Sequence, residues 1–154
     1  MTLTGKNRSL PLWSTVLIAL TILFSSLRAV ADIPEPSDNP DSPAVAVSID
    51  SENLVELYRS LPNMRIIDVR HHEDYVQGHI ETARNLPLAE ADSAALDKLA
   101  KSAEQAMVLY CNGNAGDASI KAIQITSGCG YKRLFWLRGG VVEWRDKDYP
   151  YVID

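Results

Sequence analysis

Cysteine is scarce in this chain, with only Cys111 and Cys129 among 154 residues. Two cysteines cannot build the multi-bridge framework that stabilises many small secreted domains. A single bridge between them is also disfavoured, because the helical stretch separating them would hold their ends about 15 Å apart. A disulfide requires Cα atoms within about 7 Å of each other. The sequence therefore predicts two unbridged thiols.

Histidine and positive charge are also limited. The three histidines, His71, His72 and His79, have no spacing to a cysteine that matches a zinc site, so we predict no metal and no other cofactor. Lys and Arg number 15 against 20 Asp and Glu, a net charge of −5. This balance disfavours binding to nucleic acid or to an anionic membrane. Any anion that the protein binds must therefore be held by local dipoles rather than by the overall charge.

The N-terminus has the three parts of a secretory signal peptide. Lys6 and Arg8 precede an apolar run at 16–24, and Ala29-Val30-Ala31 offers a small-residue cleavage site. We expect residues 1–31 to be removed and the protein to be exported, in a bacterium to the periplasm. The alternative is an uncleaved inner-membrane anchor, because residues 10–27 come close to the length that spans a bilayer.

Proline and acidic residues dominate the next segment, residues 32–43, which contains four prolines. Such a composition cannot bury a core, so we interpret it as an extended linker. The globular domain then covers residues 44–154. Removal of residues 1–31 would leave 12 Lys and Arg against 20 Asp and Glu, a formal charge of −8.

Apolar runs and helical patterns alternate through the globular part. Strands are expected at 44–49, 65–69, 84–86, 107–110 and 134–137, and helices at 51–61, 72–76, 88–101, 119–127 and 141–145. This alternation predicts an α/β fold with a mostly parallel sheet and helices on both faces. Sites in such sheets lie at the carboxyl ends of strands, where Asp68 and Cys111 fall.

Cys111 is the strongest candidate for chemistry. It follows the apolar residues 106–110 and opens a glycine-containing loop that leads into a helix. A thiol there faces backbone N–H groups and the positive end of the helix dipole. Both favour the thiolate, which is the reactive form. The alternative is a buried structural cysteine, against which the glycine-bearing loop argues.

Two sets of motifs resemble a rhodanese domain across residues 46–152. The first runs from Ile66-Ile67-Asp68-Val69-Arg70 to Ala83-Arg84-Asn85-Leu86-Pro87 and includes Gly78-His79-Ile80. The second comprises Leu109-Tyr110-Cys111, Gly130-Tyr131, Leu137-Arg138-Gly139-Gly140 and Trp144. The resemblance implies a rhodanese-like fold around a five-stranded sheet. It also implies a cysteine that carries sulfane sulfur as a persulfide.

The site implied by this resemblance centres on Cys111 as the catalytic residue. The backbone N–H groups of the following loop would hold the persulfide and the donor: Asn112, Gly113, Asn114, Ala115, Gly116, Asp117 and Ala118. Asp68 and Arg70 would support this loop, Arg70 either as a cation near the site, like Arg138, or as the structural partner of a nearby carboxylate. The partners would be a small sulfur donor (thiosulfate, a persulfide or a polysulfide) and a thiol or protein acceptor. Covalent catalysis of this kind needs no metal.

The loop departs from the common sulfurtransferase pattern. Gly116 stands where the family often has an Arg, the helix-starting Ser119 comes eight residues after Cys111, and Asp117 adds a negative charge. A carboxylate there would repel thiosulfate and oppose thiolate formation. Two function classes therefore stay open, a sulfurtransferase or persulfide carrier and a catalytically weak module that binds a protein or senses redox state.

Overall fold

The computed structural model of the protein describes residues 45–113 and 117–154. The predicted signal peptide at 1–31 and the linker at 32–43 lie outside these ranges. Three predicted loop residues, Asn114, Ala115 and Gly116, lie outside them as well. Within the two described ranges, no helix is long and apolar enough to cross a membrane.

A five-stranded sheet forms the centre of the domain. Its strands are β1 (Val47–Ile49), β2 (Arg65–Asp68), β4 (Arg84–Asn85), β5 (Met107–Tyr110) and β6 (Leu134–Leu137). They lie in the order β1-β6-β5-β2-β4, and every neighbouring pair is parallel. β5 and β6 are buried throughout, as expected of strands that are covered on both faces. The predicted α/β fold with a central parallel sheet is confirmed.

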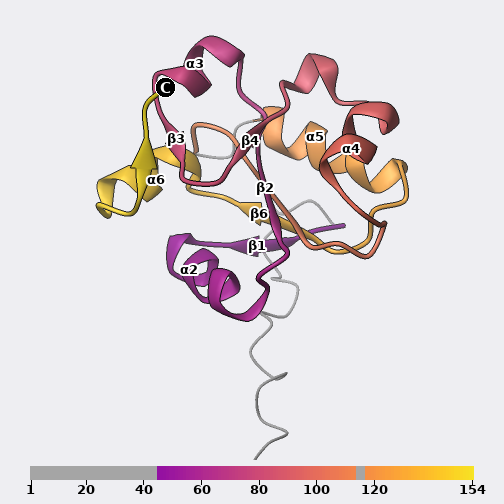
Figure 1. Ribbon diagram of the computed structural model, residues 1–154, viewed down its shortest axis with the longest axis horizontal. Coiled ribbons are helices and arrows are strands. Elements are labelled where there is room, and N and C mark those ends of the chain that lie inside the picture. The colour runs from indigo at the N-terminus through magenta and orange to yellow at the C-terminus, as the bar shows by residue number, and fades with distance from the viewer. Residues whose placement is uncertain (1–44, 114–116) are drawn as a thin grey trace, which may run out of the picture. The chain divides into compact units, whose positions relative to one another are not determined.

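Helices cover both faces of this sheet (Figure 1). On one face, α2 (Ser51–Ser60) and α6 (Gly140–Asp146) contribute Leu54 and Trp144 to a core with Val108. On the other, α4 (Ser93–Leu99) and α5 (Asp117–Gly128) contribute Leu96 and Ile123 to a core with Leu109. Successive residues of β5 thus enter opposite cores, because side chains alternate across a strand.

Helix α2 begins where its capping residues predict. The side chain of Asp50 accepts a hydrogen bond from the backbone N–H of Asn53 at 2.8 Å, and the Asn53 side chain accepts one from the N–H of Asp50 at 3.3 Å. This reciprocal capping box satisfies two N–H groups at the start of α2. The helix ends at Ser60, two residues before Pro62.

The prediction of one continuous helix over residues 88–101 is wrong. The chain forms a short 3₁₀ helix, η2 (Leu88–Glu90), and then α4. Ala91 between them has an extended backbone, and Asp92 caps α4 by accepting a hydrogen bond from the N–H of Ala95 at 2.8 Å. Helical composition hid this break, because the Asp92 cap competes with a continuous helix.

A second, two-stranded sheet was not predicted. β3 (His79–Ile80) pairs antiparallel with β7 (Tyr151–Val152). The backbone N–H of Asp154 donates to the carbonyl of Val76 in α3 (His72–Val76), so the C-terminus lies beside that helix (Figure 1). Two-residue strands are too short to leave a periodic pattern in the sequence.

Candidate active site

Cys111 directly follows β5 at the carboxyl edge of the sheet, and the residue is 7% exposed. Its Sγ lies 3.3 Å from the hydroxyl of Ser119, in the first turn of α5. The indole N–H of Trp136 donates to the same hydroxyl oxygen at 3.0 Å. Because the indole occupies an acceptor position, the proton of Ser119 is directed away from Trp136. Ser119 can therefore donate to a sulfur anion.

The turn from β6 into α6 holds the backbone that follows Cys111. The backbone N–H groups of Val141 and Val142 donate to the carbonyls of Cys111 and Asn112 at 3.0 and 3.1 Å. Gly140 has a φ of +58°, and a Cβ atom there would collide with the Cys111 carbonyl. Only glycine permits this close approach without strain. The amides at the start of α6 thus fix the first residues of the loop.

Asp68 and Arg70 form a buried ion pair beside the site. The Arg70 Nε lies 2.9 and 3.0 Å from the two carboxylate oxygens, and the side chains are 7% and 0% exposed for Arg70 and Asp68. The guanidinium also donates to the Gly78 carbonyl at 2.8 Å and reaches the Asn112 side chain at 3.5 Å. Burial alone would lower the pKa of Arg70, but the hydrogen bonds and charge of Asp68 raise it above its ordinary value.

Two further side chains secure this pair. Asn85 donates from its amide to the carbonyls of Asp68 and Arg70 at 3.1 and 3.0 Å. The hydroxyl of Tyr110 accepts the backbone N–H of Ile80 at 3.2 Å. Burial, and then the charge of Asp68, raise the pKa of Tyr110 above its usual range. Tyr110 is therefore a neutral structural group, unsuited to act as a base.

A cavity of about 570 Å³ opens over Cys111. Its described apolar wall consists of Val69, Leu88, Ala89 and Ala118, and its described polar wall of Arg70, His71, Asp74, Asn112, Gly113 and Asp117. A thiol that lines a partly apolar cavity, next to a hydroxyl donor, can attack an electrophilic sulfur.

Residues 52–147, more than half of the chain, match the family described as Rhodanese-like domain. The chain belongs to this family. The rhodanese resemblance of its motifs is thereby confirmed.

Curated relatives share this domain within longer proteins. A tRNA uridine(34) hydroxylase of Hamiltonella defensa is 32% identical over 96 residues, which are 58% of this chain and 26% of the relative. An HTH-type transcriptional regulator of Mycobacterium tuberculosis is 34% identical over 93 residues, which are 60% of this chain and 39% of the relative. This rhodanese-like chain thus spans well under half the length of either.

Solved structures share the fold. A protein of Bacillus halodurans is 26% identical with a TM-score of 0.62, covering 69% of this chain and 76% of its own. A thiosulfate sulfurtransferase of Pseudomonas aeruginosa is 21% identical with a TM-score of 0.60, covering 69% of this chain and 20% of its own. At 21% identity the second likeness concerns the fold alone.

The structure brings most of the predicted site residues together. Cys111, Asn112, Gly113, Asp117 and Ala118 all line the cavity, and so does Arg70. Asp68 lies behind Arg70 and fixes it. Asn114, Ala115 and Gly116 lie outside the described residues.

Ser119 and Trp136 have roles that the sequence reasoning missed. The parallel register pairs Trp136 with Leu109, and alternation places Cys111 on the same face as Leu109. This register places the indole near the thiol, and it is not apparent from the sequence alone. Asp74, which also lines the cavity, was not predicted as a site residue either.

The remaining thiol and the histidines lie apart from this cavity, except His71. Cys129 is partly exposed just after the other end of α5, and the two cysteines form no disulfide with each other. His79 Nδ1 lies 3.0 Å from the Tyr75 carbonyl, and its ring stacks on Tyr75 at a centroid distance of 3.8 Å. In the part of the chain that the structure describes, no group of three His, Cys, Asp or Glu side chains could hold a metal ion.

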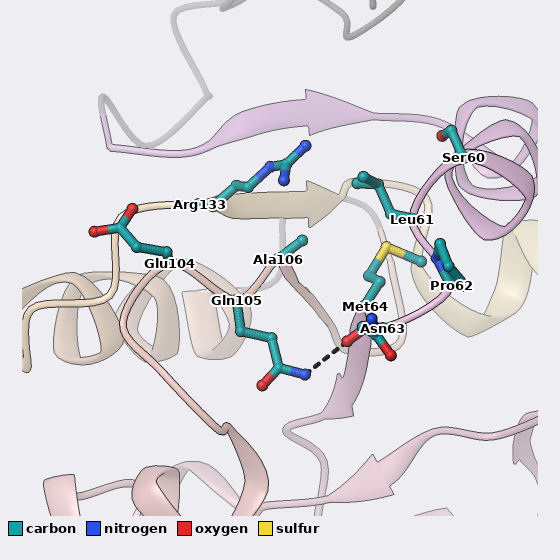
Figure 2. Close-up of a pocket in the computed structure, with 9 residues that line it drawn as sticks. All are labelled: Ser60, Leu61, Pro62, Asn63, Met64, Glu104, Gln105, Ala106 and Arg133. Carbon is teal, nitrogen blue, oxygen red and sulfur yellow. Dashed lines mark hydrogen bonds between the residues drawn. The ribbon is translucent and has the colours of Figure 1, made fainter. Parts of the chain in front are cut away.

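A smaller hollow of about 200 Å³ lies at the opposite edge of the sheet (Figure 2). Met64, Ala106 and Arg133 line it and precede β2, β5 and β6, so it lies at the amino ends of these strands. Gln105 closes one side by donating to the Asn63 carbonyl at 2.6 Å. Ligand sites in open parallel sheets lie at carboxyl ends, which favours the Cys111 cavity as the functional site.

Proposed function

We propose that this protein is a sulfurtransferase or persulfide carrier that moves sulfane sulfur through Cys111. The observation that carries the proposal is the position of the Cys111 thiol. It lines a cavity of about 570 Å³ and lies 3.3 Å from the Ser119 hydroxyl, in a rhodanese-like domain. No nucleic-acid chemistry is proposed, because the tRNA hydroxylase relative shares only 26% of its length with this chain.

The reaction has two displacement steps. The Cys111 thiolate, having lost its proton to solvent, attacks the outer sulfur of the donor. The S–S bond of the donor breaks, the donor leaves as a thiolate or as sulfite, and Cys111 carries a persulfide anion. An acceptor thiolate then attacks the outer sulfur, and Cys111 leaves as a thiolate. Ser119 stabilises the sulfur anion in both steps.

The charges around the cavity favour a thiol-borne donor over thiosulfate. Arg70 is the only cation that lines the cavity among the described residues, and Asp68 neutralises it. Arg138, a second cation expected near the site, is not among the described lining residues. Asp117 adds a negative charge. An alkyl persulfide, with at most one negative charge on its sulfur, brings less negative charge to this wall than the thiosulfate dianion does.

Intact-mass spectrometry tests the proposal. Purified protein is incubated with a polysulfide or with thiosulfate, and a mass gain of one sulfur is expected. Cys111→Ser should abolish the gain, whereas the matched variant Cys129→Ser should keep it. A native protein that gains no sulfur from either donor would instead favour a rhodanese-like binding or redox-sensing module.

Export through residues 1–31 is also part of the proposal, on the support of the sequence pattern alone. N-terminal sequencing of the mature protein should begin at Asp32. A chain that retains Met1 and stays in the membrane after a carbonate wash would support the inner-membrane anchor instead.

A further inference from the structure

The charged groups around the cavity leave an excess of negative charge. The only described cationic group in the wall, Arg70, is matched by Asp68 at hydrogen-bond distance. The wall also contains Asp74 of α3 and Asp117 of α5. Neither carboxylate forms an ion pair with another described residue. His71, the remaining basic side chain of the wall, is exposed.

The cavity is also larger than an inorganic donor requires. Its volume of about 570 Å³ lies within the range of small-molecule sites, about 300–1,000 Å³. Val69 and Leu88 give it an apolar side that can contact a short carbon chain. A ligand that fits this wall has a sulfur at one end, a short aliphatic body and no negative charge beyond that of its reacting sulfur.

We propose that the acceptor that takes sulfur from Cys111 is a small aminothiol, selected by Asp74 and Asp117 through its ammonium group. This proposal rests on the proposed sulfur transfer. The acceptor thiolate, whose proton has gone to solvent, attacks the outer sulfur of the Cys111 persulfide. The S–S bond breaks, Cys111 leaves as a thiolate, and the acceptor departs as its own persulfide. The ammonium group does not react, and no oxidant is consumed.

Three thiols of similar size and different charge test the selection. Protein loaded with polysulfide, its persulfide verified by mass, is mixed at pH 8 with cysteamine, 2-mercaptoethanol or 3-mercaptopropionate. Loss of the added sulfur is followed for native protein and for Asp74→Asn/Asp117→Asn. The ratio of the variant rate to the native rate cancels the intrinsic reactivity of each thiol.

We expect the variant to react with cysteamine about five-fold more slowly and with 3-mercaptopropionate about five-fold faster, with 2-mercaptoethanol between them. One carboxylate about 8 Å from a unit charge, in a water-like dielectric, changes the rate about two-fold, and the effects of the two carboxylates multiply. Salt at about 1 M should shrink both effects, because it shortens the screening length to about 3 Å.

The matched control is Asp146→Asn, which removes an exposed carboxylate that does not line the cavity. Its ratios should stay near one for all three thiols. If the persulfide forms but the double variant changes all three rates by one common factor, the charge selection is wrong while sulfur transfer stands. If no persulfide forms, the proposed function fails first, and the mass measurement records that separately.

Discussion

Breaking the buried Asp68–Arg70 pair should strongly destabilise the protein. The carboxylate is fully buried, the guanidinium side chain is 7% exposed, and three further contacts of Arg70 depend on the same geometry. Asp68→Asn keeps the shape and removes one charge, which leaves a buried cation unpaired. Loss of one partner of such a pair costs about 3–5 kcal/mol.

Urea unfolding measures this cost. With a dependence on urea of about 1.5 kcal/mol per molar, a loss of about 3 kcal/mol lowers the midpoint by about 2 M. Arg70→Met should lower the midpoint by a similar amount. The double variant Asp68→Asn/Arg70→Met has no unpaired charge, so we expect it to lose only about 1–2 kcal/mol, chiefly from the Gly78 carbonyl that Arg70 no longer reaches.

A surface pair gives the matched control. Glu56 and Arg59 lie 2.7 Å apart, but their side chains are 68% and 71% exposed. Glu56→Gln should change the stability by at most about 0.5 kcal/mol, or about 0.3 M in midpoint. The reasoning is refuted if Asp68→Asn shifts the midpoint no more than this control, or if the double variant loses the sum of the two single losses.

Three further substitutions test the site. Asp117→Asn should raise the rate of sulfur uptake from thiosulfate about five-fold, because one carboxylate changes the rate about two-fold for each of the two negative charges of thiosulfate, and it should leave a neutral donor almost unaffected. If the substitution leaves the rates with both donors unchanged, this carboxylate faces away from the site. Ser119→Ala should slow iodoacetamide labelling of Cys111 about ten-fold near pH 6, because a hydrogen bond to a charged group contributes about 1.5–3 kcal/mol. An unchanged labelling rate would mean that Ser119 does not stabilise the thiolate. Gly140→Ala should destabilise the protein by at least about 2 kcal/mol in urea unfolding, whereas Gly128→Ala, with open space around it, should not; equal effects would contradict the close approach to Cys111.

The sequence predicted the sheet and the position of Cys111 because long apolar runs and turn residues report on local structure. The parallel strands β2 and β5 had to bring Asp68 and Cys111 to one edge. The contacts of Ser119 with Cys111 and Trp136 depend on tertiary register, which one sequence does not encode in a local pattern. The break at Ala91 was not predicted for a related reason. Helix propensity is a weak preference, and the Asp92 cap at the start of α4 overrides it.

The two carboxylates at the cavity also have a structural reason to be there. Asp74 is the third residue of α3 and Asp117 the first of α5, so both lie in first helical turns. An acidic side chain there interacts favourably with the helix dipole by about 0.3–1 kcal/mol. Removing either charge would make the cavity more tolerant of anionic ligands and would weaken the helix that carries it. The rejection of anionic ligands and the stability of α3 and α5 therefore favour the same two residues. Arg70, the one described cation of the wall, is held in place by Asp68.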